Sequence, residues 1–380
     1  MTRAEREKGK LRKFHSYYDY SLLFLTLFLV CFGLVMIYST SSYNASRDYG
    51  NPAYYLEKQG AFAVLGVIVM LIVSKIDYRI YIKKLPVLRI KPVTLLYLFC
   101  ILLQIAVLIF GIEVNGSKRW ISIAGFRFQP SELSKIAIIL FTAYIVNLSP
   151  SKLDKFKGFL RVVIFDAPLI ILVLIPNFST ALVMAAIMVA ICFVASRKKL
   201  YFIVSGILMG GVGAAFIFGV SYRSTRIDVW KNVETHPKGY QILQGLYAIA
   251  SGGIFGKGLG ESMQKLGFIP ESHNDMIFAV ICEELGLFGA VAVILLFVLL
   301  IWRLFVIAIS APDLYGGLIA TGVLTHIAVQ VLLNIAVVTN TIPSTGIPLP
   351  FISYGGSSLM VLLFEMGIAL SVSNQIKYER

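Results

Sequence analysis

Ten long apolar stretches constrain this chain more than any other feature. A segment needs about 20 mostly apolar residues to cross the hydrocarbon core of a bilayer as a helix. The stretches cover residues 22–38, 60–76, 94–112, 134–147, 162–176, 180–196, 201–220, 276–302, 316–339 and 354–373. The sequence therefore predicts an all-α integral membrane protein with ten transmembrane helices.

The composition excludes the soluble classes. Hydrophobic residues make up 58% of the chain and charged residues only 14%, whereas soluble domains have about 45–50% and 25%. Disordered, collagen-like and disulfide-scaffold chains are excluded as well. The four cysteines Cys31, Cys100, Cys192 and Cys282 lie in apolar stretches without metal-ligand spacing. We expect them to be buried thiols that form neither disulfides nor a zinc site.

The distribution of the 34 Lys and Arg residues predicts the orientation. Ten crossings place both termini on one side, and that side carries roughly twice as many bases as the other, which marks it as cytoplasmic. The net charge of +14 is then explained by orientation and anionic lipid, so no nucleic acid partner is expected. We divide the chain into a cytoplasmic basic N-terminus (1–19), a ten-helix membrane domain (20–374) and a cytoplasmic C-terminus (375–380). The basic start lacks a cleavage site, which predicts a retained anchor.

Three external loops are candidates for function: 113–129, 340–353 and the large loop 221–275 between helices seven and eight. Long loops without their own fold are uncommon unless they are functional. Apolar residues at 242, 243, 246 and 247 predict a short amphipathic helix at the membrane interface. The absence of an internal repeat weakens an inverted-repeat transporter interpretation.

The first motif comprises residues 115–120 and 129–135. Lys118 and Arg119 are bases on the side that orientation disfavours, and Trp120 suits either an interfacial anchor or a substrate contact. Glu132 and Lys135 are three residues apart and are therefore neighbours on one helix face. An ion pair near the membrane favours a functional position, with purely structural pairing as the alternative.

The glycine-rich segment 252–260 is a weak candidate for a nucleotide loop, because no strand precedes it and no GKS or GKT follows. We expect a flexible re-entry at the membrane surface. In segment 343–358, three prolines within eight residues exclude a regular helix. Such a backbone is tolerated at membrane depth where it is buried or lines a watery cavity.

The segment 264–275 runs directly into the eighth helix, with Asp275 at its mouth. Asp275 suits either a helix N-cap or a general base, because a helix N-terminus stabilises an ionised carboxylate that can accept a proton. His273 is expected to form hydrogen bonds at the interface rather than to bind a metal. Glu283, Glu284 and Glu365 fall in apolar stretches and should face the bundle interior.

These motifs together resemble the SEDS family, the bacterial shape, elongation, division and sporulation proteins. The family's NGSxRW, QPSE–K, FIPE–H–D and PFISYGGSS elements occur here in order, and the resemblance spans about residues 19–374. Two departures stand out: Asn274 replaces the threonine of the family's His-Thr-Asp, and Asn177 replaces the aspartate of its PDLGT. Residues 310–316 and 337–339 resemble the division type, FtsW, more than the elongation type, RodA; the sporulation type, SpoVE, is very similar.

The resemblance implies a ten-helix polymerase of peptidoglycan glycan strands that uses lipid II. Asp275 matches the family's catalytic aspartate. The implied partners are a class B penicillin-binding protein (an FtsI-type transpeptidase) and other divisome membrane proteins. The implied location is the bacterial cytoplasmic membrane, at the division septum.

The chemistry can also be argued from the residues. A sugar pyrophosphate already has a good leaving group, so the reaction needs positive charge near the pyrophosphate and a base for the attacking hydroxyl. We hypothesise that Asp275 deprotonates the acceptor's 4-hydroxyl as it attacks the anomeric carbon, which inverts an α linkage to β-1,4. A divalent cation, Mg or Mn, could assist, although no ligand cluster supports one.

The external bases available to the pyrophosphate are Lys118, Arg119, Arg223, Arg226, Lys257 and Lys265. The full set of candidate substrate contacts is Lys118, Arg119, Trp120, Glu132, Lys135, Arg223, Arg226, Lys265, Glu271, His273, Ser353, Tyr354 and Ser357. Two other classes of function remain open. One is a lipid II flippase with Glu283, Glu284 and Glu365 along its path, and the other is a non-catalytic scaffold for the transpeptidase.

Overall fold

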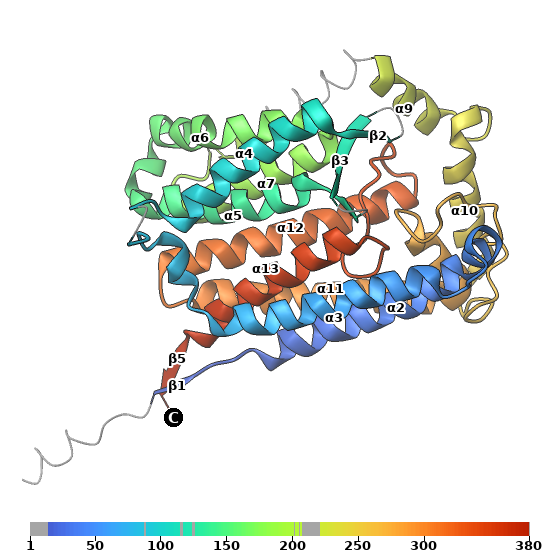
Figure 1. The fold of residues 1–380 in the computed structure, drawn as a ribbon, viewed down its shortest axis with the longest axis horizontal. Coiled ribbons are helices and arrows are strands. Elements are labelled where there is room, and N and C mark those ends of the chain that lie inside the picture. The colour runs from blue at the N-terminus through green and yellow to red at the C-terminus, as the bar shows by residue number, and fades with distance from the viewer. Residues whose placement is uncertain are drawn as a thin grey trace, which may run out of the picture.

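Long helices run side by side along the longest axis of the molecule (Figure 1). The computed structural model describes residues 14–86, 89–114, 117–123, 126–200, 202–204, 206 and 221–379. The long helices are α2 (Tyr20–Tyr49), α3 (Tyr54–Lys75), α4 (Pro92–Phe110), α5 (Pro130–Leu148), α6 (Phe156–Leu174), α7 (Phe178–Ala195), α11 (Ile277–Ser310), α12 (Leu314–Val338) and α13 (Gly356–Asn374). The shorter helices are α9 (Ser221–Lys231), α10 (Tyr240–Gly252) and the 3-10 turns η1 (Tyr78–Ile82), η2 (Pro150–Asp154) and η3 (Pro237–Gly239).

The helices confirm the membrane prediction. Within the described ranges, eight are long and apolar enough to span a bilayer, so the chain is a multi-pass membrane protein. The nine long helices described coincide with nine of the ten predicted stretches; the other, 201–220, lies almost wholly outside the described residues. Helix α6 is not among the eight candidate spans because Lys157, Arg161 and Asp166 interrupt its apolar sequence.

Capping residues decide where several helices begin, which apolar patterning alone misplaced. Asp19 accepts the Leu22 N–H at 2.9 Å, so α2 begins before the predicted stretch. Asn177 accepts the Thr180 N–H at 3.2 Å at the start of α7. An asparagine caps a helix about as well as an aspartate does. The Asn177 departure from the family pattern therefore preserves this local role.

The external loop 113–129 contains a small sheet that we had not predicted. Strands β2 (Ile112–Val114), β3 (Ser117–Ile123) and β4 (Phe126–Phe128) form an antiparallel sheet in that order. Strands β2 and β4 have only three residues each and give almost no periodic signal, and the seven residues of β3 do not alternate regularly between apolar and polar, so sequence patterning missed the sheet.

A second sheet joins the two ends of the described chain. Strand β1 (Phe14–Ser16) pairs antiparallel with β5 (Lys377–Glu379). We call the end of the bundle that carries β1 and β5 the terminal end, and the opposite end, which carries α9 and α10, the loop end (Figure 1). This pairing agrees with an even number of crossings.

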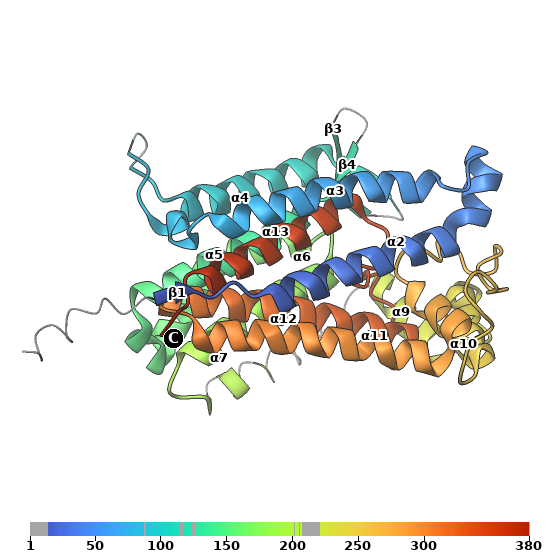
Figure 2. The ribbon, with the colours of Figure 1, turned by 90° about the horizontal axis from the view of Figure 1, so that it is seen from below.

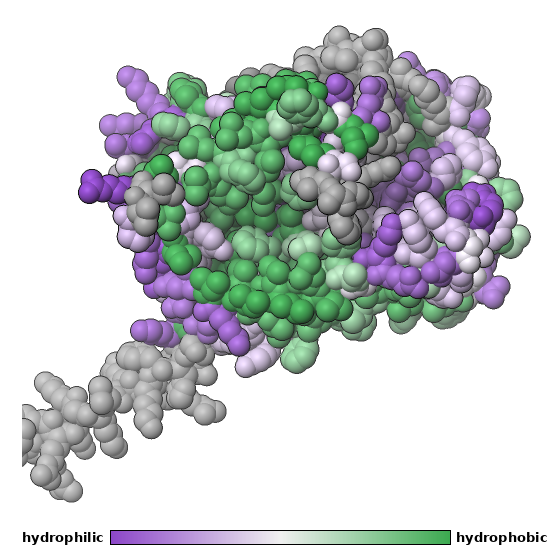
Figure 3. Space-filling model, viewed as in Figure 1, coloured by the Kyte–Doolittle hydropathy of each residue, from purple (hydrophilic) through white to green (hydrophobic). Residues whose placement is uncertain are grey.

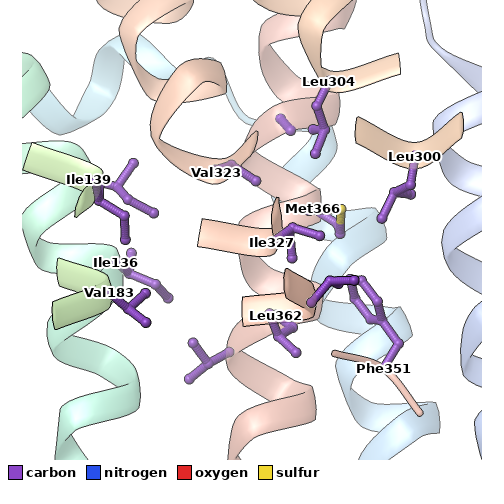
Figure 4. Packing of buried hydrophobic residues seen from close by; sticks show 14 of the residues in the cluster. Ile136, Ile139, Val183, Leu300, Leu304, Val323, Ile327, Phe351, Leu362 and Met366 are labelled. Carbon is purple, nitrogen blue, oxygen red and sulfur yellow. The ribbon is translucent and has the colours of Figure 1, made fainter. Parts of the chain in front are cut away.

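The core lies between α5, α7, α11, α12 and α13. Its side chains include Ile136, Ile139, Val183, Leu300, Leu304, Val323, Ile327, Phe351, Leu362 and Met366 (Figure 4). Seen from below, α3 and α4 form one layer, with α13 and α5 next to it and α11 and α12 beyond (Figure 2). A hydrophobic band covers the middle of one face, with hydrophilic surface at both ends, as a bilayer requires (Figure 3).

Helix α11 is broken at Gly286, which has φ 66° and ψ −166°. The backbone groups freed by the break bind the glycine-rich segment 252–258. The four bonds are Lys257 N–H to Glu283 O (2.9 Å), Gly258 N–H to Glu284 O (2.9 Å), Leu287 N–H to Gly253 O (2.9 Å) and Phe288 N–H to Ile254 O (3.1 Å). The expectation of a flexible re-entry was wrong, because this segment is fastened to α11.

We predict that Gly286→Ala lowers the thermal unfolding temperature in detergent. An added Cβ would lie 2.3 Å from Gly256 N and 2.5 Å from Ile254 O, and the positive φ adds backbone strain. Together these should cost about 2 kcal/mol or more. Gly60→Ala in α3 is the control, because an added Cβ there meets nothing within 4 Å. Equal unfolding temperatures for the two variants would contradict this account of the kink.

Candidate active site

Three successive backbone carbonyls hold the segment that contains Asp275. The His273 carbonyl accepts the Tyr354 N–H at 2.9 Å. The Asn274 carbonyl accepts the Ser353 hydroxyl at 2.7 Å, and the Asp275 carbonyl accepts the Asn334 amide at 2.8 Å. We call these three bonds the carbonyl clamp. The clamp fixes the backbone of Asp275 against α12 and the segment before α13, at the loop end.

The proline-rich segment 340–355 supplies much of this support and is itself held by neighbouring helices. Asn334 also donates to the Ile347 carbonyl at 2.8 Å. Gln330 donates to the Pro348 carbonyl at 3.0 Å, and Arg226 donates to the Ser344 carbonyl at 2.7 Å. The prolines keep this segment from forming a helix, so its backbone carbonyls need other hydrogen-bond partners. Side chains from α9 and α12 supply three of them.

Asp275 itself is not a helix cap. Met276 occupies the N-cap position of α11, and no side chain caps that helix. The half-buried Asp275 carboxylate accepts the Gln241 amide at 3.4 Å. Its Oδ2 lies 4.0 Å from the position that a Cβ on Gly346 would take. The N-cap interpretation of Asp275 is therefore wrong, and its carboxylate is directed to α10 and the proline-rich segment.

Burial raises the pKa of Asp275 to about 6, and Glu271 raises it further, while Arg226 and Gln241 oppose the rise. We had expected the helix N-terminus to favour the anion; the cost of burial outweighs that effect. A carboxylate with a pKa near 6 is still mostly ionised at neutral pH and is a stronger base than an ordinary aspartate.

His273 lies beside Asp275 in an aromatic environment. Its ring centroid is 4.4 Å from that of Tyr55 and 5.4 Å from that of Tyr354. Burial lowers the pKa of His273 to about 4, so the ring is neutral at physiological pH. Burial likewise raises the pKa of Tyr354.

The predicted pair of Glu132 and Lys135 is present and buried, with 3.1 Å between Nζ and Oε2. Ser358 donates to Glu132 at 2.8 Å, and Lys135 lies 3.4 Å from the Gln330 amide oxygen. The pair therefore connects α5 with α12 and α13. Through Gln330, which donates to the Pro348 carbonyl, it is also linked to the proline-rich segment.

Contrary to the prediction that it is available to the pyrophosphate, Lys265 does not face the solvent. It is only 4% exposed, and its ammonium binds Glu284 at 2.7 Å. Lys257 binds Glu283 at 2.6 Å. A buried base that neutralises a buried carboxylate is unavailable to a pyrophosphate without a large desolvation cost. The structure therefore argues against Lys265 as a substrate contact.

The three glutamates in apolar stretches are buried, as predicted. Glu283 and Glu284 bind the lysines of the large loop, and Glu365 lies 2.7 Å from His326 Nδ1. All three carboxylates are therefore engaged by bases or an imidazole.

Other predicted contacts are spread over the loop end. On β3, Lys118 is exposed, Trp120 is partly buried, and Arg119 donates to the Pro176 carbonyl at 2.8 Å. Glu271 is exposed, with φ 47°, and accepts the Asn274 amide at 2.8 Å.

The three remaining predicted contacts are Ser357, Ser353 and Arg223. Ser357 is partly buried in the first turn of α13. Ser353 is buried; its hydroxyl donates to the Asn274 carbonyl and accepts the Leu349 N–H at 2.8 Å, so it serves the protein's own backbone. The Arg223 side chain lies outside the described residues.

Across the described ranges, no group of three or more His, Cys, Asp and Glu side chains could hold an ion. No step of the reaction is therefore assigned to a protein-held metal.

Sequence reasoning missed Gln241, Gln330 and Asn334. The last two share a signal that was available: with His326 they recur every fourth residue along the apolar helix α12. That spacing places them on one face. Gln241 lay in the segment predicted to be a short amphipathic helix, which α10 confirms.

Comparison with known proteins agrees with the motifs. A family model described as cell cycle protein, covering FtsW, RodA and SpoVE, matches residues 20–378. Stage V sporulation protein E of Bacillus subtilis (strain 168) is 40% identical, over 95% of this chain and 98% of its own length. A probable peptidoglycan glycosyltransferase FtsW of Trichlorobacter lovleyi is 38% identical, over 95% and 94%.

The fold also matches a chain from a peptidoglycan synthase complex, studied for its structural coordination of polymerization and crosslinking. The TM-score is 0.77 at 26% identity, and the match covers 94% of this chain and 97% of the other. The predicted SEDS resemblance is confirmed. The chain belongs to the FtsW, RodA and SpoVE family of cell cycle proteins.

Proposed function

We propose that this chain is a peptidoglycan glycosyltransferase that polymerises lipid II into β-1,4 glycan strands, with Asp275 as the general base. The observation that carries the proposal is an aspartate whose backbone is held by the carbonyl clamp and whose carboxylate has a pKa near 6, at the end of the bundle opposite the termini. The relatives named as peptidoglycan glycosyltransferases support the reaction class.

The proposed reaction is a single displacement. Asp275 removes the proton from the 4-hydroxyl of the acceptor sugar while that oxygen attacks the anomeric carbon of the donor. The bond from the anomeric carbon to the pyrophosphate breaks, and the pyrophosphate leaves with the electron pair. Attack from the opposite face converts the α linkage into a β linkage. A base poised near the working pH contributes about 10²–10⁴-fold to such a step.

Positive charge for the departing pyrophosphate comes from the external bases that do not neutralise a glutamate of α11. Arg226 lies close enough to Asp275 for its charge to lower the pKa of that carboxyl. Lys118 is exposed on β3, and Arg119 is beside it. Lys257 and Lys265 are not needed, since each neutralises a glutamate of α11.

The pairing of the intramembrane glutamates supports a polymerase over a flippase. A polar transit path would need carboxylates free to meet a passing headgroup, whereas Glu283, Glu284 and Glu365 each lie within 2.7 Å of a basic group. Glu283 and Glu284 fasten the large loop to α11, and Glu365 joins α13 to α12.

For the biological setting, we propose septal cell-wall synthesis during division, with both termini in the cytoplasm. The FtsW names of several relatives support the division role. A class B penicillin-binding protein is the proposed partner, in line with the matched complex that couples polymerization to crosslinking. Other divisome membrane proteins complete the proposed assembly.

Asp275→Asn should abolish polymerisation by the purified protein. The amide keeps the shape of the side chain but cannot accept the hydroxyl proton, so the rate of strand formation from lipid II should fall about 100-fold or more. Glu261→Gln, in the same loop, is a control of matched chemistry. A wild-type rate for Asp275→Asn would refute the assignment of the base.

The rate should also depend on pH through the raised pKa of Asp275. The base is active only when ionised, so kcat/KM should be constant above pH 7. Below about pH 6 it should fall about tenfold per pH unit. Initial rates in a series of buffers test this expectation. If kcat/KM instead fell to half its plateau only near pH 4, burial would not raise the pKa of this carboxylate.

Asn334→Leu should lower kcat about 10- to 100-fold and leave KM within about threefold, because misplacing a reacting group by about 1 Å costs that much. The change removes the donor to the Asp275 and Ile347 carbonyls. Thr325→Val on the same helix is the control, since that hydroxyl bonds only locally to Thr321 O. If both variants show equal kcat, Asn334 does not position Asp275.

A further inference from the structure

The glycine-rich segment that is fastened to the break in α11 exposes large apolar side chains. Ile254 is 64% exposed and Phe255 is 83% exposed. The ammonium groups of the neighbouring Lys257 and Lys265 are turned inward, to Glu283 and Glu284 of α11. A loop in water has the opposite arrangement, with lysines outside and large apolar side chains inside. We call Ile254 and Phe255 the apolar tip; the proposed reaction does not use them.

Helix α2 shows where the two interfaces of the bilayer lie. Tyr20 and Tyr38 are exposed on this helix, and the exposed Phe24 and Phe28 lie between them. Tyrosines at both ends of an apolar stretch are typical of the two membrane interfaces. The 18 residues from Tyr20 to Tyr38 rise about 27 Å, close to the thickness of the hydrocarbon core. Tyr20 therefore marks the interface at the terminal end, and Tyr38 marks the one at the loop end.

Hydrogen bonds transfer this depth from α2 to the apolar tip. Ser39, next to Tyr38, donates to the Glu284 carboxylate at 2.7 Å, so Glu284 lies near the loop-end interface. Phe288 follows Glu284 by about one helical turn in the direction of the bilayer centre. The Phe288 N–H donates to the Ile254 carbonyl at 3.1 Å. The apolar tip therefore lies about 5 Å inside the hydrocarbon boundary.

The backbone of the segment is suited to this depth. Non-helical backbone is tolerated within a membrane where protein groups satisfy its hydrogen bonds. The four bonds to the break in α11 supply such partners on both sides of the apolar tip. Gly256 permits the close approach, because an added Cβ would lie 2.1 Å from the Glu284 carbonyl oxygen. The segment is thus a fixed re-entry rather than a flexible one.

The exposed face of α11 continues the surface of the apolar tip. Leu287, Phe288, Val291 and Leu295 are all exposed on this helix, which is apolar and long enough to span the bilayer. In Figure 2, α10, which leads into the segment, lies beside the loop-end part of α11. A partner in water would need an apolar surface beyond the interface, whereas this one lies within it. Lipid is therefore the occupant that the depth favours.

We propose that the glycine-rich segment re-enters the leaflet at the loop end and that the apolar tip contacts the acyl chains of lipid there. The proposal goes beyond the polymerase function and does not depend on it. It also gives the break at Gly286 a role, since the break frees the backbone groups that hold a loop at this depth. The contact anchors the large loop at a fixed height relative to the membrane.

Thiol reactivity tests the depth of the apolar tip. Cys31 is exposed and is first replaced, as Cys31→Ala. Phe255→Cys is then compared with Asp48→Cys, an exposed position of α2 beyond Tyr38, in nanodiscs of phosphatidylethanolamine and phosphatidylglycerol. A charged, water-soluble maleimide should modify Phe255→Cys at least about tenfold more slowly, because only the thiolate reacts and lipid disfavours its formation.

Three controls complete the comparison. Both thiols should react at equal rates once the protein is unfolded in sodium dodecyl sulfate. Val298→Cys, an exposed position of α11 nearer the bilayer centre, is the reference for a thiol in lipid. Ile254→Cys replaces Phe255→Cys if the latter does not fold. The proposal is overturned if the thiol at the apolar tip reacts as fast as the one at position 48.

Fluorescence quenching identifies what covers the apolar tip. A nitrobenzoxadiazole label on Phe255→Cys, attached in detergent before reconstitution, should be quenched by lipids that carry a doxyl group on the acyl chain, as the Val298→Cys label is. Aqueous iodide should quench mainly the Asp48→Cys label. Quenching of the Phe255→Cys label by iodide and not by doxyl lipid would overturn the proposal and indicate a surface for a partner in water. Neither measurement requires turnover of lipid II, so a failed polymerase function would not change the result.

Discussion

The hydrogen bonds to the carbonyls of His273, Asn274 and Asp275 are the constraint on which the site depends. They join the end of the large loop to α12 and to the segment before α13. Three parts of the chain that are distant in sequence therefore meet at residues 273–275. The side chain of Asp275 has few bonds of its own. Its position therefore follows from its backbone, which leaves the carboxylate available for chemistry while burial tunes its pKa.

Bonds to α11 likewise hold the large loop in place at the membrane surface. Two adjacent glutamates of α11 bind two lysines of the loop, and the break at Gly286 opens backbone groups to which segment 252–258 bonds. Ion pairs with a buried carboxylate contribute little net stability against an apolar alternative, but removing one partner is costly. They fix one arrangement of the loop relative to the helices.

Much of the fold could be predicted, since helices and closed barrels alone satisfy their backbone within lipid, and apolar stretches of about 20 residues indicate helices. The missing information was local or tertiary. Asp19 and Asn177 set helix ends by capping, and the strands at 112–128 were too short or too irregular in sequence to leave a pattern. Asp275 was identified through its motif. Lys265 was misjudged because a sequence shows a charge but not the carboxylate that neutralises it, and Asn334 acts only through backbone distant in sequence.

Reconstitution into liposomes tests the central claim most directly. The purified chain is placed in vesicles whose lipid II is confined to the leaflet that faces the loop end, and strands and transbilayer movement are followed together. The account predicts glycan strands in that leaflet, while lipid II placed in the opposite leaflet stays there. Lipid II that crosses the membrane without any strand being formed would contradict it.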